Sequence, residues 1–237
     1  LNEPRLKQRS AVLSVEPPSL KETLKVLWLQ RSFRHILVAF CVSYFFTAGV
    51  SQWKAIFFMR NHGMGAGELG AWLALAWGGC SILGNYLGGY CASRYAARQE
   101  KLQMRVVSLL FVINVLVSIM IYLSPNKYMA LTFVAVTAVV TTLVGGSVFA
   151  AIQSLVKERM RSVAIALIFM FANLIGFGLG PLALGILSDQ LNPTFGQESL
   201  RYALAAFSLG GLWIAAHYWK AANTIEDDIR RAESEAG

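Results

Sequence analysis

Long runs of uncharged apolar residues constrain this chain more than any other feature of its sequence. Residues 106–124 contain no charged side chain, and a helix of that length reaches about 28 Å, close to the ~30 Å hydrocarbon core of a bilayer. Similar runs predict helical spans at about 35–59, 67–92, 106–124, 128–154, 163–188 and 202–219. None of them alternates apolar and polar residues as a membrane β-strand does. The sequence therefore predicts an all-α membrane protein with six transmembrane helices.

The composition excludes a soluble enzyme, a disordered chain and a disulfide scaffold. Charged residues make up 14% of the 237 residues, whereas soluble domains carry roughly 25%. Cys41, Cys80 and Cys91 lie inside apolar runs, and their number and spacing fit neither a disulfide framework nor a zinc site. We expect these cysteines to be small packing residues, and we expect no metal and no cofactor.

The net charge of +8 reflects membrane topology. Seventeen of the 21 Lys and Arg residues lie before the first span, after the second span, after the fourth span or in the tail. This one-sided alternation follows the positive-inside rule and predicts that both ends of the chain are cytoplasmic in a multi-pass cell-membrane protein. It also argues against nucleic acid as a partner.

The segments outside the membrane are predicted to be short. Residues 1–34 form a cytoplasmic linker, in which a capping box at 19–22 precedes an amphipathic helix near 19–31. The alternative is that this helix extends the first span. Residues 35–220 form the transmembrane domain, and 221–237 form a loose, polar cytoplasmic tail.

Spans two and five share a pattern. Leu83-Gly84, Gly89 and Ser93 recur as Leu179-Gly180, Gly185 and Asp189, at a constant offset of about 96 residues. Because three spans separate the two copies, they run in opposite senses across the bilayer, which predicts two inverted three-helix repeats. Such repeats build many secondary transporters. Helix packing alone also places glycines in membrane helices.

The loop after span two carries a motif that resembles a known family. Gly89-Tyr90-Cys91-Ala92-Ser93-Arg94-Tyr95-Ala96-Ala97-Arg98 is similar to the Gly-x-x-Ala-Asp-Arg-x-Gly-Arg-Arg motif of the major facilitator superfamily. Ser93, Ala96 and Ala97 replace the Asp, the Gly and the first Arg of the closing pair. Further stretches resemble bacterial spinster-like members, namely 52–64, 158–161 and 178–181, with Gly185 and Asp189 beyond.

The resemblance implies the C-terminal six-helix half of a twelve-helix transporter. Its partners would be the lipid bilayer, a small organic or amphipathic substrate, and the N-terminal six-helix half of the same gene product. A six-span chain working as a homodimer is the alternative. Two halves would rock around a central site in alternating access.

Polar residues inside the spans predict that site. Tyr44, Thr47, Ser51 and Lys54 fall on one helical face of the first span, and a cation in a membrane points to function. The alternative for Lys54 is that it extends to the interface. Further candidate substrate-binding residues are Trp77, Asn85, Thr141 and Asn173.

Spans three and six are almost uniformly apolar and are expected to face lipid, outside the central spans one, two, four and five. A six-span channel, a membrane-embedded scaffold and an intramembrane hydrolase are the alternative functions. A hydrolase built on Ser147 needs a base within reach, yet all three histidines lie near span ends. We therefore expect a transporter and not an enzyme.

Overall fold

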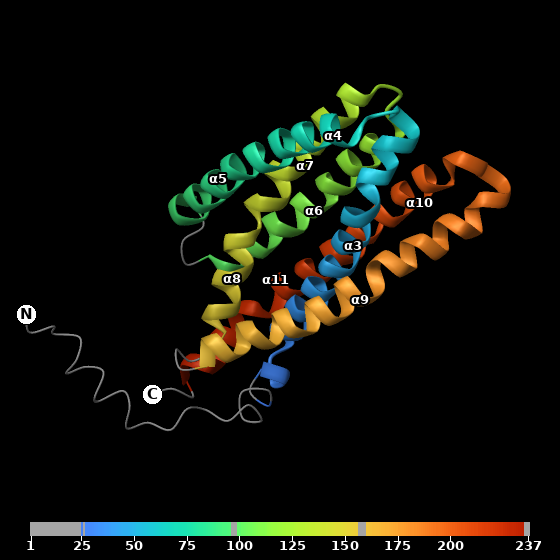
Figure 1. Ribbon diagram of the computed structural model, residues 1–237. Coiled ribbons are helices and arrows are strands. Elements are labelled where there is room, and N and C mark those ends of the chain that lie inside the picture. The colour runs from blue at the N-terminus through green and yellow to red at the C-terminus, as the bar shows by residue number, and fades with distance from the viewer. Residues whose placement is uncertain (1–24, 26, 96–98, 156–159, 235–237) are drawn as a thin grey trace, which may run out of the picture.

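The computed structural model describes residues 25, 27–95, 99–155 and 160–234, and within these ranges the regular elements are all helices. They form six long segments that run antiparallel along the chain (Figure 1). In chain order the segments are α3 (Arg31–His62), α4–η1–α5 (Ala66–Leu73, Ala74–Gly79 and Cys80–Tyr95), α6 (Glu100–Leu123), α7–α8 (Lys127–Leu143 and Gly145–Ser154), α9 (Arg161–Phe195) and η3–α10–α11 (Gly196–Glu198, Ser199–Ser208 and Gly210–Ser234). The predicted all-α, six-helix membrane architecture is confirmed.

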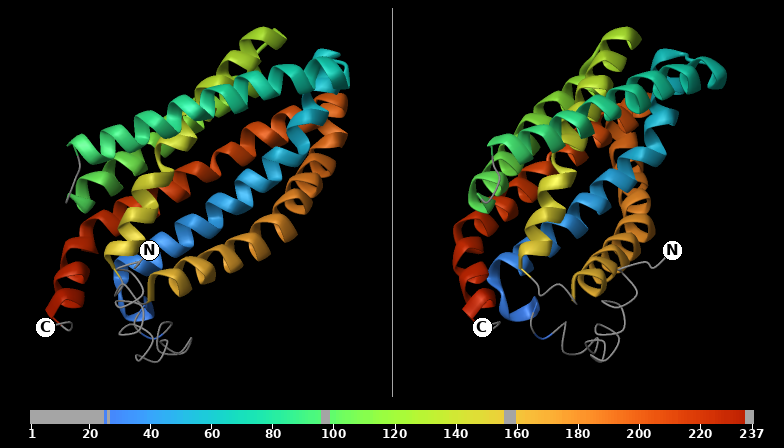
Figure 2. Two further views of the ribbon diagram at one scale, coloured as in Figure 1. Left: turned by 60° about the vertical axis from the view of Figure 1, so that its left-hand side comes forward. Right: turned by 90° about the vertical axis from the view of Figure 1, so that its left-hand side faces the viewer.

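One end of the bundle gathers the basic residues. At this end α3, α6 and α9 begin, while α5, α8 and α11 end (Figure 2). We call it the basic end, because Arg31, Arg94, Arg161 and Arg230 all lie there. The opposite end holds the short connections after α3, α6 and α9.

The connections at the opposite end use residues that suit sharp turns. Gly63 ends α3 with a φ of 63°, a left-handed conformation that favours glycine, and Gly196 ends α9 with a φ of 53°. Asn126 caps α7, since its side-chain oxygen accepts a hydrogen bond from the Tyr128 N–H at 2.8 Å. Tight turns here keep consecutive segments antiparallel.

The outer surface of the bundle is apolar. Five stretches of the described chain are long and apolar enough to cross a membrane. The last of them, Arg161–Arg231, has 71 residues. The chain turns back at Gly196 within this stretch, which therefore contains two segments, the fifth and the sixth. Leu174 and Ile82 are 71% and 70% exposed, and many other large apolar side chains are exposed with them. Apolar surface of this extent is typical of contact with lipid.

Glycines let the middle helix of each three-helix repeat approach a helix of the other repeat. In α5, Gly84 and Gly88 face the backbone of α7 at Val139 and Leu143. In α9, Gly180 faces the backbone of α3 at Phe45. The matching glycines Gly84 and Gly180 thus pack against the first helix of the opposite repeat, as expected for an inverted pair.

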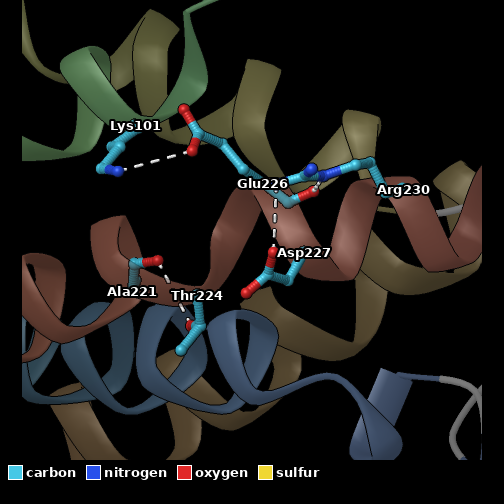
Figure 3. A network of polar contacts seen from close by, with 6 residues as sticks. All are labelled: Lys101, Ala221, Thr224, Glu226, Asp227 and Arg230. Carbon is cyan, nitrogen blue, oxygen red and sulfur yellow. Dashed lines mark hydrogen bonds and ion pairs between the residues drawn. The ribbon is translucent and has the colours of Figure 1, made fainter.

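The polar tail differs from the loose segment expected from the sequence. α11 continues to Ser234, and Ala221, Ala222 and Ile225 on its inner face are buried. Lys101 of α6 pairs with Glu226 at 3.4 Å, and Arg230 pairs with Asp227 at 3.1 Å (Figure 3). The helix persists because its apolar stripe still has α3 and α6 to pack against after the surrounding residues have become polar.

Most of the predicted amphipathic helix near 19–31 lies outside the described residues. Residues 27–29 are helical, and the helix breaks at Gln30, whose extended backbone precedes α3. The Gln30 side chain donates a hydrogen bond to the Leu155 carbonyl at 2.7 Å. The start of α3 is thereby attached to the end of α8.

Candidate functional site

A cavity of about 580 Å³ lies inside the bundle. Its walls come from α3, the η1 turn, α6, α7 and the α10–α11 segment. The volume lies within the range of roughly 300–1,000 Å³ that is typical of small-molecule sites. The cavity is lined by polar and apolar side chains together, which suits an amphipathic ligand.

Lys54 supplies the positive charge of this cavity. Its ammonium nitrogen lies 4.8 Å from the centre of the Trp77 ring, across the space between α3 and η1. Among the described lining residues, Lys54 is the one charged side chain. The side chain turns inward over the indole and not outward to the interface, which favours the cavity interpretation over snorkelling.

The position of Trp77 depends on an irregular helical turn. Residues Ala74–Gly79 form a π-helix, in which one extra residue widens the turn between α4 and α5. Leu73, Ala74, Trp77 and Gly78 from this region all line the cavity. Short π-helical turns are frequent at functional sites, because they displace a side chain from the regular helical register.

The polar face of the first span divides between two environments. Thr47 and Ser51 line the cavity with Lys54, and the Ser51 hydroxyl donates to the Ala48 carbonyl at 3.0 Å. Tyr44 lies outside the cavity. Its ring stacks on Phe40 at 4.9 Å between centroids and meets Phe169 edge-on at 6.1 Å, so it is part of the α3–α9 contact.

Of the remaining predicted site residues, some line the cavity and others are exposed on the surface of the bundle. Thr141 lines the cavity, and its hydroxyl lies 3.5 Å from the Asn114 side-chain oxygen. Asn85 and Asn173 are exposed on α5 and α9, where their amides donate to the Ser81 and Phe169 carbonyls of their own helices. The structure thus brings Thr47, Ser51, Lys54, Trp77 and Thr141 together. Substrate binding by any of these residues stays a prediction.

Sequence reasoning missed the wall made by α6. This helix was expected to face lipid, yet Asn114 and Ser118 line the cavity beside Phe111 and Tyr122. The signal was present, because Asn114 and Ser118 are two of the few polar residues of a largely apolar run and lie one turn apart. The opposite face of α6 is exposed as expected, at Leu109 and Leu116 for example.

The α10–α11 segment contributes a second unexpected wall. Phe207, Ser208, Gly211 and Ile214 line the cavity from the segment that was also expected to be peripheral. Gly211 packs closely against Val115 of α6. The described residues include no group of three His, Cys, Asp or Glu side chains that could hold a metal ion.

The arrangement can bind an acceptor group and an apolar body at the same time. The Lys54 ammonium is a donor for an anionic or carbonyl group, and burial in apolar surroundings strengthens such a contact relative to water. The rings of Trp77, Phe46 and Phe111 offer apolar contact nearby.

A sequence model of the family described as Major Facilitator Superfamily matches residues 1–181. A protein of Mycolicibacterium smegmatis (strain ATCC 700084 / mc(2)155) described as an MFS-type efflux pump is 30% identical over 224 residues, covering 92% of this chain and 51% of that protein.

Two crystal structures of a bacterial homolog to the human lysosomal transporter Spinster share the fold. The inward-facing and occupied form aligns with a TM-score of 0.72 over 84% of this chain and 50% of the other. The inward-facing and unoccupied form aligns with a TM-score of 0.76 over 90% of this chain and 52% of the other. Both are 20% identical in sequence. The chain therefore spans about half the length of the proteins it matches.

Proposed function

The chain belongs to the major facilitator superfamily, and from this premise we propose that it is the C-terminal six-helix half of a secondary active transporter. The transporter moves a small organic or amphipathic solute across the membrane by alternating access. The cavity beside Lys54 forms this half's wall of the transport path. The other wall comes from an N-terminal six-helix half of the same gene product.

One observation carries the assignment of the site. Lys54, a cation inside a membrane bundle, lies 4.8 Å from the Trp77 ring and has no ion pair among the described residues. An unpaired charge in a membrane interior costs free energy, so such a residue points to a functional site. Its chemistry selects a solute with an anionic or strongly accepting group next to an apolar body.

The charge distribution supports an orientation. With the basic end in the cytoplasm, the connections at 63–65, 124–126 and 196–198 face the other side of the cell membrane. The cavity then opens and closes by rocking of the two halves, while the six helices described above move largely as one body. Because the M. smegmatis relative is described as an efflux pump, efflux is the direction to test first.

Efflux assays on the full-length transporter test the proposal. Cells expressing it should retain less of at least one amphipathic anionic dye than cells carrying an empty vector. Lys54→Ala should reduce the transport rate at low dye concentration about tenfold or more, since hydrogen bonds to charged groups contribute about 1.5–3 kcal/mol. Lys54→Arg should retain part of the rate.

The matched control is Lys101→Ala, which removes a lysine from the exposed pair with Glu226 outside the cavity and should change the rate little. Unchanged transport by Lys54→Ala would overturn the site but leave the transporter assignment standing. Absence of movement for every solute tested, in either direction, would overturn the assignment. If the six-span chain transports as a homodimer, a second copy of it takes the place of the proposed N-terminal half.

A further inference from the structure

A second cavity of about 640 Å³ lies on the outer surface of the bundle, and Phe46 is the one described residue that it shares with the Lys54 cavity. Its lining residues come from α3, from α9 and, at Trp213, from α11. The helices α9 and α11 lie on either side of α3 (Figure 2). None of the described residues that line it is charged, and they include Leu37, Val38, Phe171 and Ile175. We call it the outer groove.

The outer groove is long enough to span one leaflet. Along α3 it extends from Phe33 to Phe46, about 20 Å at 1.5 Å per residue. Half of a hydrocarbon core of ~30 Å is about 15 Å. Because the groove starts beside Leu27 and Trp28 at the basic end, it covers the depth of the leaflet at that end. An acyl chain from this leaflet fits its length and its apolar lining.

Positive charge gathers at the mouth of the groove. Arg34 lies one turn before the groove residues Leu37 and Val38 on α3, and Lys220 lies two turns after Trp213 on α11. Both side chains are exposed, and neither forms an ion pair among the described residues. The nearby carboxylate of Asp228 is already bonded to Ser32.

Two histidines join these charges into one site. The Nδ1 atoms of His35 and His217 lie 3.1 Å apart between α3 and α11, and the His217 ring contacts the groove residue Trp213 at 5.9 Å between centroids. The charge of Lys220 acts on both rings, and that of Arg34 acts on His35. Such surroundings repel a metal cation and attract an anion. Their ring N–H groups can donate to phosphate oxygens.

We infer that the outer groove binds a phospholipid with an anionic headgroup from the leaflet at the basic end. Its acyl chain lies along α3 between α9 and Trp213, and its phosphate contacts Arg34 and Lys220 beside the histidine pair. The inference rests on the proposed function, because it places the chain in a bilayer with its basic end in the cytoplasm. The lipid is a fixed partner of the fold and not the transported solute.

Native mass spectrometry of the full-length transporter in detergent tests this inference without any transported solute. The purified protein is titrated with dioleoylphosphatidylglycerol or with dioleoylphosphatidylcholine, and bound lipids are counted. We expect tighter retention of the phosphatidylglycerol. Arg34→Gln with Lys220→Gln should weaken its binding about 25-fold, or about fivefold for each charge, and leave phosphatidylcholine binding unchanged.

Matched controls separate the site from general effects of charge and bulk. Arg60→Gln with Lys127→Gln removes two positive charges at the opposite end and should not alter binding. Val38→Trp fills the outer groove and should weaken both lipids, whereas Leu109→Trp on the exposed face of α6 should not. Equal loss in the two charge variants, or full retention by Val38→Trp, would overturn the inference.

Other occupants give different results in the same spectra. If deletion of residues 1–24 creates phosphatidylglycerol binding that the intact protein lacks, that segment fills the groove and the inference fails. If Val38→Trp converts a dimer to a monomer, a second copy fills it and the inference also fails. Neither result bears on the efflux of dye through the Lys54 cavity, so a failure of this inference is distinguishable from a failure of the proposed function.

Discussion

Asp228 of α11 accepts two hydrogen bonds from Ser32 of α3, one from the backbone N–H and one from the hydroxyl, each at 2.7 Å. The two residues are 196 positions apart in the chain, and both are buried. Ser32 lies in the first turn of α3, where backbone N–H groups have no partner within the helix. A carboxylate from the last helix therefore caps the first one, and the favourable end of the helix dipole adds to the contact.

Asp228→Ala should lower the free energy of unfolding by about 2–3 kcal/mol, because it leaves a buried hydroxyl and a helix N-terminus without their acceptor. Thermal unfolding of the purified protein in detergent measures this as a lower Tm. Asp227→Ala is the control, since Asp227 is exposed and its one ion-pair partner among the described residues is Arg230, at 3.1 Å. Equal changes in the two variants would show that the bond to Ser32 contributes nothing specific.

The close packing of α5 on α7 predicts opposite behaviour for two adjacent glycines. A Cβ at Gly88 would lie 2.6 Å from the Leu143 carbonyl oxygen, whereas a Cβ at Gly89 would meet nothing within 4 Å. Gly88→Ala should therefore destabilise the protein by about 1–3 kcal/mol through displacement of the α7 backbone. Gly89→Ala should be neutral or slightly stabilising, since alanine favours the helix. Comparison of the two Tm values with the parent decides between packing and helix propensity.

The α3–α9 contact contains a hydrogen bond next to a proline. The Trp53 indole N–H donates to the Pro181 carbonyl at 2.9 Å, and the ring packs over Gly185. Trp53→Phe keeps an aromatic ring and removes the donor, so we expect a loss of about 1 kcal/mol in unfolding free energy. Trp72→Phe on α4 is the control, because no hydrogen bond joins the Trp72 indole to any described residue. A Tm for Trp53→Phe that equals the parent's would exclude a stabilising role for this bond.

Much of the fold was predictable because apolar run length determines where helices can cross a bilayer. The helix ends were less predictable, as the polar continuation of α11 to Ser234 shows. There the spacing of Ala221, Ala222 and Ile225 gave a helical signal that the polar composition obscured. The π-helical turn at Ala74–Gly79 has no comparable pattern in the sequence, because it depends on how neighbouring helices pack.

The candidate site was predicted in part, and tertiary packing explains the difference. Helical periodicity places Tyr44 on the same face as Thr47 and Lys54, but Gly176 makes room for it against α9. Asn114 of α6 lines the cavity because α6 packs against α7 and α11 inside the bundle, which hydropathy alone does not reveal. Local patterns thus identify polar faces, whereas the choice of neighbour decides which of them meet.

The contact between Lys54 and Trp77 makes a prediction about coupling that does not depend on knowing the solute. If the indole stabilises the ammonium inside the cavity, Trp77→Leu and Lys54→Met should not have additive effects on the unfolding free energy. The double-mutant cycle should give a coupling of about 1 kcal/mol, within the range for partly desolvated cation–π pairs. Trp77→Phe should keep part of it, because a smaller ring still presents a π face at that position. A coupling near zero would mean that the 4.8 Å approach is incidental. Lys54 would then be held by the cavity's hydroxyl and amide groups, and Asn114→Leu with Lys54→Met would be the pair that couples.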